Sequence, residues 1–368
     1  MNNWYKKITA ACLIITALFT VTGCSNSSQP KEKMPTHIVT DLVGNKVELP
    51  QEVKKLAVVP IPFATIVVAL DGNSNLLAAI HPGAMSAYKG SLLEKIDPNF
   101  AKLDTKLINQ NFSVNMEGLA AANVDACLMW KYQEQDAQKL NKIGVKSVLI
   151  YNDTVDNLKK SFLIVGKILN KEDKAQELIK YYDESYNSIV QHKNEVAKSQ
   201  KPTILFLRNP QLRLQGNDNF MHEALEISGA HNPFAQTALD QNNKSISMEE
   251  IYRINPDIIF LSNFDKFTPD DLYNNKIPAQ DWSSIKAVKN HRVYKVPMGL
   301  YRWDAPSVET PLMMKWLAHT LQPQIFSNIN VRSDAKDFYK KFLNIDLTDD
   351  ELSLIFADEA NKNSLPLD

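Results

Sequence analysis

The stretch KEDKAQELIKYYDESYNSIVQHKNEVAK, from Lys171 to Lys198, decides the fold. It contains neither proline nor glycine, and its apolar and aromatic side chains recur with helical spacing at Leu178, Tyr181, Tyr182, Tyr186 and Ile189. A single helix over the whole stretch would be about 42 Å long at 1.5 Å per residue. A rod of that length can cross a whole lobe, so the stretch predicts a strut between two lobes, within a helical linker over residues 155–198.

Short apolar runs alternate with helical patterns on both sides of this linker. They lie at residues 56–59, 79–80, 124–129 and 147–150 before it, and at residues 203–207, 257–261 and 292–296 after it. Continuous apolar strands between helices are typical of parallel sheets that are covered on both faces. We therefore expect an α/β fold, with two α/β lobes of mainly parallel strands joined by one long helix.

The ends of the chain complete this plan. Residues 39–50 predict a hairpin around a Gly-Asn turn at Gly44 and Asn45, and residues 334–343 and 349–357 predict two amphipathic helices. The expected domains are an N-terminal lobe at 37–154, the linker at 155–198, a C-terminal lobe at 199–326 and a helical appendage on that lobe at 327–368.

The first residues predict export. Lys6 and Lys7 precede an apolar run at residues 8–21, which is too short to span a bilayer comfortably and has the form of a signal peptide. The run ends in Val21-Thr22-Gly23-Cys24, which resembles the bacterial lipobox. We expect a signal peptide at 1–23, lipidation of Cys24, a polar tether at 24–36 and a protein anchored to the cell membrane on its outer side.

The charge balance argues against a nucleic-acid-binding protein, and the cysteine count leaves one thiol in the mature chain. With 41 basic and 42 acidic residues the formal charge is −1, so no overall field attracts nucleic acid. Cys12 leaves with the signal peptide and Cys24 would carry lipid, which leaves Cys127 alone in the mature chain. Because Cys127 lies in an apolar run, we expect a buried and inert thiol.

A weak internal repeat also indicates two lobes. Asn115-Met116-Glu117 is followed, seven residues after the glutamate, by Val124-Asp125 and a strand pattern, and Ser247-Met248-Glu249 is followed at the same interval by Pro256-Asp257 and a strand pattern. Asn115 and Ser247 suit helix N-caps, which places Glu117 and Glu249 at the second helical position.

Several segments together resemble the substrate-binding proteins of ABC importers for iron-siderophores, haem and cobalamin. The resemblance covers nearly all of the mature chain, from DLVGNKVELP at 41–50 through NPDII at 255–259 to WSSIKAVKNHRVY at 282–294. It implies two lobes joined by a long helix, a cleft between them, modest closure on binding, and a permease and an ATPase as partners of a monomeric chain. It also implies that Glu117 and Glu249 dock on the permease; the alternative is that they only complement helix dipoles.

The carboxyl ends of the strands indicate where a ligand would lie. The residues there are mostly aromatic or cationic, and the candidates are Phe63, His81, Trp130, Lys131 and Tyr132 on the first lobe and Arg208, Tyr301, Arg302 and Trp303 on the second. Rings can cover the faces of a large anionic chelate, and guanidinium groups pair with its oxygens. Tyr301 and His81 are possible direct ligands of a metal. For single residues, core packing or local ion pairs remain the alternative.

The leading hypothesis is a binding protein, not an enzyme, that delivers an iron-siderophore-type chelate to an ABC importer and carries no cofactor of its own. Haem, corrinoid and nickel chelates are alternative ligands. A surface-anchored metal-dependent enzyme and a non-binding structural lipoprotein are the other classes. HExxH, CxxC, Gly-x-Ser-x-Gly and a Gly-rich strand-to-helix turn are all absent from the sequence.

Overall fold

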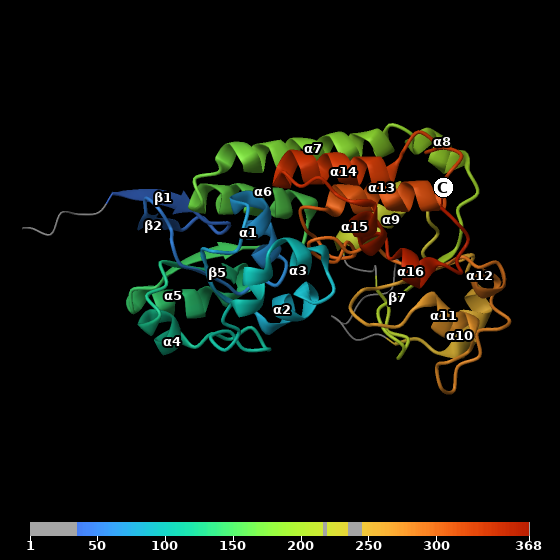
Figure 1. Ribbon diagram of the computed structural model, residues 1–368, viewed down its shortest axis with the longest axis horizontal. Helices are drawn as coiled ribbons and strands as arrows, with labels where there is room; N and C mark the ends of the chain where they lie inside the picture. Colours follow the sequence, from blue (N-terminus) through green and yellow to red (C-terminus); the bar gives the residue numbers. More distant parts are fainter. Residues whose placement is uncertain (1–34, 216–218, 235–244, 368) are drawn as a thin grey trace, which may run out of the picture. The chain divides into compact units, whose positions relative to one another are not determined.

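Two parallel sheets, which lie before and after three linker helices in the sequence, form the framework (Figure 1). The computed structural model describes residues 35–215, 219–234 and 245–367. The predicted signal peptide, the lipobox with Cys24 and nearly all of the tether lie outside these residues. The two-lobed α/β architecture expected from the sequence is confirmed.

The first sheet has the strand order β4-β3-β5-β6, and all its neighbouring pairs are parallel. Its strands are β3 (Leu56–Val58), β4 (Leu77–Ile80), β5 (Ala126–Trp130) and β6 (Lys146–Ile150). The helices of this lobe are α1 (Phe63–Asp71), α2 (Pro82–Tyr88), α3 (Leu92–Ile96), α4 (Met116–Ala121) and α5 (Glu134–Lys142), with 3₁₀ turns at Pro98–Lys102 and Lys131–Gln133.

The second sheet has the order β7-β8-β9 and is also parallel. Its strands are β7 (Ile204–Leu207), β8 (Ile258–Leu261) and β9 (Val293–Lys295), and its helices are α9 (Asn219–Ile227), α10 (Met248–Ile254), α11 (Pro269–Tyr273), α12 (Lys286–Lys289) and α13 (Thr310–Leu321). All residues of these strands are buried, as expected for strands covered on both faces.

The predicted hairpin forms from β1 (Thr36–Thr40) and β2 (Lys46–Pro50), which pair antiparallel. Gly44 has φ of 92°, a left-handed conformation that glycine adopts without strain. The Asp41 carboxylate accepts the backbone N–H groups of Val43 and Asn45 and so closes the turn.

The linker corrects one expectation, because residues 171–198 are not a single helix. After α6 (Val155–Ile168), α7 covers Glu172–Val190, and a separate α8 covers Lys193–Lys198. The 19 residues of α7 span about 28 Å. At the break the His192 ring packs edge-on against Phe326, a tertiary contact, and its Nδ1 bonds Glu195, three residues further on in α8.

The C-terminal helices correct a second expectation. They are α14 (Val331–Leu343), α15 (Asp349–Ile355) and α16 (Asp358–Asn361). α16 packs on β9 and α11 of the second lobe, but α14 contacts α1 and α15 contacts α3, both in the first lobe. The segment is therefore packed against both lobes rather than attached to the second alone.

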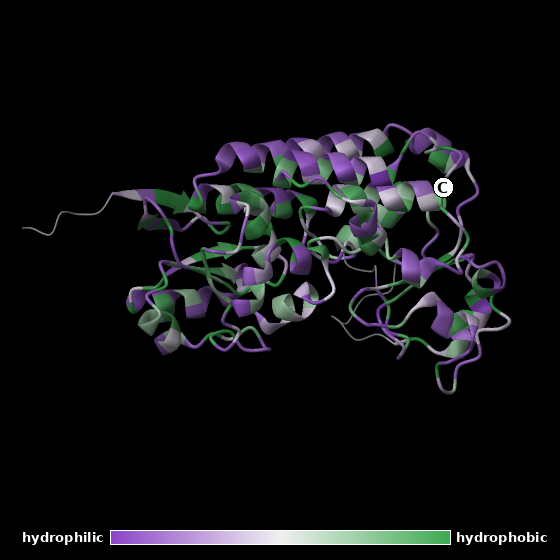
Figure 2. Cartoon of the chain, in the orientation of Figure 1, coloured by the Kyte–Doolittle hydropathy of each residue, from purple (hydrophilic) through white to green (hydrophobic). Residues whose placement is uncertain are grey.

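Apolar residues concentrate on the strands and on the helix faces that cover them, whereas α7 is largely hydrophilic on its visible side (Figure 2). Cys127 lies in this core, so its expected burial is confirmed, and burial raises the pKa of its thiol to about 12, which disfavours the reactive thiolate. Within the described ranges, no helix is long and apolar enough to cross a membrane.

Candidate functional site

The carboxyl ends of the first sheet carry a cluster of aromatic rings. The Trp130 ring lies edge-on to Phe63, with 6.2 Å between ring centroids, and is stacked with Tyr132 at 6.2 Å. Tyr151, which follows β6, packs edge-on against both Trp130 and Tyr132. Phe63 and Trp130 are buried, while Tyr132 is 61% exposed. The cluster therefore exposes the ring of Tyr132, which is packed on the buried ring of Trp130.

Lys131 lies beside this cluster. Its Nζ is 4.2 Å from the centroid of the Tyr151 ring and 3.6 Å from the Asp153 carboxylate. The structure thus brings Phe63, Trp130, Lys131 and Tyr132 together in one aromatic and cationic group.

His81 stands apart from this group in its contacts. It is the N-cap of α2, where Nδ1 accepts the N–H of Gly83 at 2.8 Å and Nε2 lies 3.3 Å from the carbonyl oxygen of Gln110. The ring stacks on Phe112, and burial lowers the pKa of the imidazole. Since both ring nitrogens already have protein partners, His81 acts in this structure as a buried cap.

The second lobe gathers two arginines on one ring. The guanidinium carbon of Arg208 lies 3.5 Å from the centroid of Phe264, and that of Arg302 lies 4.6 Å from the same centroid. Arg302 also lies 5.6 Å from the Tyr301 ring and donates its Nε–H to the carbonyl oxygen of Asn263. Arg208 donates to the side-chain oxygen of Gln215. Arg208, Tyr301 and Arg302 are therefore neighbours, as the sequence predicted.

Tyr301 lies at one of the contacts between the two lobes. Its side chain is 2% exposed and packs with Ala87 of α2 and Ala305, and Ile61 from the loop after β3 packs on the same group. Burial raises the pKa of the phenol, and the charge and hydrogen bond of Arg302 oppose this shift. The net rise keeps Tyr301 protonated at neutral pH, which makes it a hydrogen-bond donor rather than a ready phenolate.

The side chain of Trp303 does not join those of Tyr301 and Arg302. It is fully buried, packs edge-on against Phe356, and donates its indole N–H to Glu309 at 3.0 Å. The loop turns at this point, with the N–H of Gly299 donating to the carbonyl oxygen of Tyr301. Trp303 therefore fills the core, and we leave it out of the proposed ligand site.

A buried carboxylate, that of Asp304, lies close enough to the two arginines to interact with their charges. Asp304 is fully buried; its carboxylate accepts the hydroxyl of Ser262, and its backbone oxygen accepts from Gln215. Burial raises the pKa of Asp304, and the charges of Arg302, Arg208 and Lys295 oppose that shift. The buried carboxylate partly balances the cations around it.

Lys295 orders the loop that carries Phe264. Its Nζ donates to the backbone oxygens of Ser262, Asp265 and Phe267 at 2.8, 2.6 and 3.0 Å. Burial lowers the pKa of Lys295 from 10.5 to about 8, and the carboxylates of Asp304, Asp265 and Asp271 oppose this shift while Arg302 adds to it. One cation thus holds three carbonyl groups at the end of β8.

We expect Lys295 to make stability depend on pH. Because its pKa is lower in the folded chain, the unfolded chain binds more protons between pH 8 and 10.5, so the free energy of unfolding rises with pH in that window. The maximum gain is about 3 kcal/mol. Urea unfolding from pH 7 to 10 should show the wild type gaining stability relative to Lys295→Met, in which all other titrating groups are the same. A constant difference would contradict the burial of a charged Lys295.

The two glutamates of the internal repeat, Glu117 and Glu249, occupy equivalent positions in their helices. Asn115 caps α4 by accepting the N–H of Gly118, and Ser247 caps α10 by accepting the N–H of Glu250. Glu117 and Glu249 are therefore the second residues of short helices, as predicted, and both are exposed. Hydrogen bonds from its own backbone and from Ser247 lower the pKa of Glu249, which stays ionised at neutral pH.

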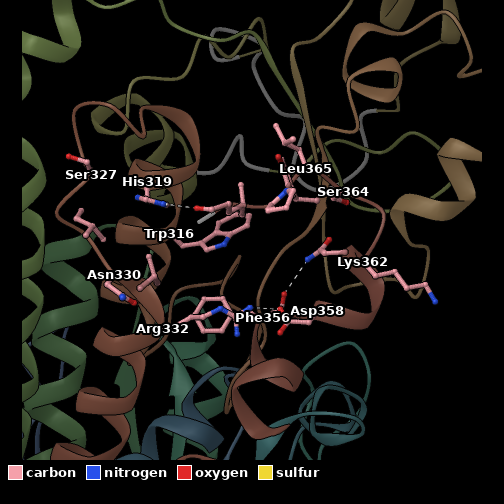
Figure 3. Close-up of a pocket in the computed structure, with 16 residues that line it drawn as sticks. Trp316, His319, Ser327, Asn330, Arg332, Phe356, Asp358, Lys362, Ser364 and Leu365 are labelled. Atoms are coloured by element: carbon pink, nitrogen blue, oxygen red, sulfur yellow. Dashed lines mark hydrogen bonds and ion pairs between the residues drawn. The ribbon is translucent and has the colours of Figure 1, made fainter. Parts of the chain in front are cut away.

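A cavity of about 710 Å³ lies elsewhere, between α13 and the C-terminal segment (Figure 3). Trp316, Arg332 and Phe356 line it, and none of the predicted ligand residues does. Its polar groups bond to the protein: Arg332 pairs with Asp358, and His319 bonds the carbonyl oxygens of Phe326 and Leu367. We assign no ligand to this cavity.

The part of the chain that the structure describes holds no group of three or more His, Cys, Asp or Glu side chains placed to bind a metal ion.

Sequence reasoning missed three kinds of residue. Phe264 and Tyr151 follow strands β8 and β6, so the rule that selected the other candidates could have found them. Asp304 and Lys295 had no signal, because their role depends on burial. Glu309 also had no signal, because its role is to accept hydrogen bonds from the loop that carries Tyr301.

Comparisons with known proteins agree with this architecture. A family model described as periplasmic binding protein matches residues 66–298. A crystal structure described as a periplasmic solute binding protein from Veillonella parvula DSM 2008 aligns with a TM-score of 0.83 and 40% identity, covering 89% of this chain and 99% of that chain.

The names of two relatives state the ligand that each of them binds. The chain is 24% identical over 351 residues to the molybdate-binding protein MolA of Haemophilus influenzae, covering 87% of this chain and 94% of the relative. It is 25% identical over 305 residues to the Fe(3+)-citrate-binding protein YfmC of Bacillus subtilis, covering 78% and 89%. The alignments span most of each relative.

Proposed function

This chain belongs to the periplasmic binding protein family and is a substrate-binding protein of an ABC importer, and we propose that it captures an anionic ferric chelate of the citrate or siderophore type. As a binding protein and not an enzyme, it passes its ligand unchanged to a permease that is driven by an ATPase. The proposal concerns the ligand and the residues that hold it.

The pairing of Arg208 and Arg302 on Phe264 carries the proposal. Two guanidinium groups on one ring, next to the Tyr301 phenol, concentrate positive charge and N–H and O–H donors at the contact between the lobes. Carboxylate, catecholate and hydroxamate oxygens are suitable partners for such donors. The exposed Tyr132 ring and Lys131 add a second, flatter surface on the first lobe, which suits a ligand larger than a bare ion. The Fe(3+)-citrate-binding relative is consistent with this class.

A compact oxyanion of the molybdate type is the second candidate. Tyr301 is packed closely against Ala87 and Ile61, which favours a small ligand at that contact. The same donors would bind its oxygens, and a molybdate-binding relative is consistent with it. Haem, corrinoid and nickel-chelate ligands belong to the same class of protein and serve as further probes.

A titration series tests the ligand. The full chain, purified in detergent, should give a saturable signal in calorimetry and in tryptophan fluorescence with ferric citrate or a ferric siderophore; N-acetyltryptophanamide controls for absorption by iron. Tyr301→Phe combined with Arg302→Ala should weaken binding by more than about tenfold, or about 1.4 kcal/mol, whereas Lys266→Ala should not. Saturation by molybdate alone would support the second candidate, and no response to either class would overturn both.

We also propose that the protein is lipid-anchored through Cys24 on the outer side of the cell membrane, and that Glu117 and Glu249 dock on the permease. Mass spectrometry of the protein extracted from its source membrane should show loss of residues 1–23 and addition of a diacylglycerol to Cys24, together with the mass of any retained ligand. An intact N-terminus without lipid would rule out the anchor.

A further inference from the structure

Glu309 is a fully buried carboxylate that accepts four hydrogen-bond donors. Oε2 accepts the backbone N–H of Tyr301 at 3.0 Å, and Oε1 accepts the backbone N–H of Leu300 at 3.1 Å and the indole N–H of Trp303 at 3.0 Å. The hydroxyl of Tyr339, from α14, also donates to Oε1. A buried carboxylate needs such donors, and bonds to a charged acceptor are stronger than neutral ones.

These bonds fix a loop that has little regular structure of its own. Between β9 and α13, the segment around Gly299 forms only an isolated bridge between Met298 and Arg302. Its amides at Leu300 and Tyr301 point to Glu309 rather than to a neighbouring strand. The Tyr339 hydroxyl is a second acceptor for the N–H of Leu300, at 3.2 Å, whereas the N–H of Tyr301 donates to Glu309. The Glu309 carboxylate therefore contributes to the position of Tyr301, and of Arg302 beside it, from outside the ligand contacts.

We propose that Glu309 is a positioning residue for ligand binding, which holds the Tyr301–Arg302 loop in the conformation that receives an anion. This inference rests on the proposed function, because it assumes that Tyr301 and Arg302 contact the ligand. The same loop accepts the backbone N–H of Leu92, in α3 of the first lobe, at Gly299. Its order is thereby linked to the approach of the two lobes.

Replacement of Glu309 by glutamine tests the role. The amide keeps the shape but turns one acceptor oxygen into an NH₂ donor that faces other donors, so the loop amides lose an acceptor. We expect faster hydrogen exchange at Leu300 and Tyr301, measured without ligand, and at least tenfold weaker binding of ferric citrate or molybdate, whichever saturates the wild type.

Trp303→Phe is the matched control. It removes one donor to Glu309 and disturbs the same core, but it keeps the carboxylate bonds to the loop amides, so its affinity should fall less than threefold. A merely structural role predicts the opposite: both variants lose stability, and neither changes exchange at residues 300–301 or affinity of the folded fraction. That result would overturn the proposal.

Two further variants keep the test decisive. If Glu309→Gln does not fold, Tyr339→Phe removes one donor to the carboxylate together with the oxygen that also accepts the N–H of Leu300 at 3.2 Å, so exchange is read at Tyr301, whose N–H donates to Oε2 of Glu309. Exchange at Tyr301 should rise and binding should weaken about threefold or more. Unchanged exchange at Tyr301 and unchanged affinity would overturn the role of Glu309. If Arg302→Ala leaves binding intact, the proposed site is wrong. If Arg302→Ala weakens binding and Glu309→Gln does not, only the positioning role is wrong.

Discussion

Reversing the charge of both Glu117 and Glu249 to arginine should abolish ligand uptake by cells while leaving ligand binding by the purified protein unchanged. Both carboxylates are exposed at the second position of N-capped helices, one on each lobe. A pair of matched acidic groups can meet basic pockets on a pseudo-symmetric permease, and the arginines would repel those pockets. The loss of the helix-dipole interaction costs only about 0.3–1 kcal/mol for each residue.

The measurement is uptake of radiolabelled ferric citrate or molybdate by cells that carry the variant as their only copy. Glu134→Arg combined with Asp349→Arg is the matched control, because it makes the same change in net charge at the first turns of two other helices. Uptake should persist in the control. Undiminished uptake in the Glu117 and Glu249 variant, or an equal loss in the control, would remove the docking role.

The sequence predicts the framework because burial leaves a periodic pattern. Every strand expected in the two sheets is present, with ends shifted by up to two residues, and the caps at Asn115 and Ser247 form as their residue types favour. The break in the linker at Gln191 and His192 was not predictable, because the stretch has no proline or glycine there and the contact found at the break joins His192 to Phe326, 134 positions further on. A local sequence pattern cannot indicate a contact with a residue that lies far along the chain.

The candidate site shows the same limit at the level of single side chains. The rule about strand ends selected Arg208, Tyr301 and Arg302, which the structure brings together on Phe264. It also selected Trp303, which turns into the core because the loop bends at Gly299 and the indole finds an acceptor in Glu309. A strand end fixes where a loop begins but not the direction of each side chain along it, which depends on buried partners such as Glu309 and Lys295.

Gly299 gives the largest stability effect that we expect from a single added methyl group. A Cβ at this position would overlap Oε1 of Glu309 and the hydroxyl of Tyr339, and would lie 2.8 Å from Cδ of Glu309. Four hydrogen bonds hold this carboxylate, so it cannot move aside without leaving buried donors without an acceptor. Overpacking costs about 1–3 kcal/mol, and each buried polar group left unpaired adds about 1–3 kcal/mol.

We therefore expect Gly299→Ala to lower the free energy of unfolding by about 3 kcal/mol or more, measured by urea unfolding. Gly44→Ala is the control: its φ of 92° strains alanine, but nothing lies within 4 Å of the added Cβ, so the loss should be smaller. Adding Tyr339→Phe to Gly299→Ala removes one of the overlapping atoms and should recover part of the loss, giving a coupling between the two sites. Additive effects, or a loss no larger than that of Gly44→Ala, would show that the carboxylate is not held rigidly and that the loop tolerates its displacement.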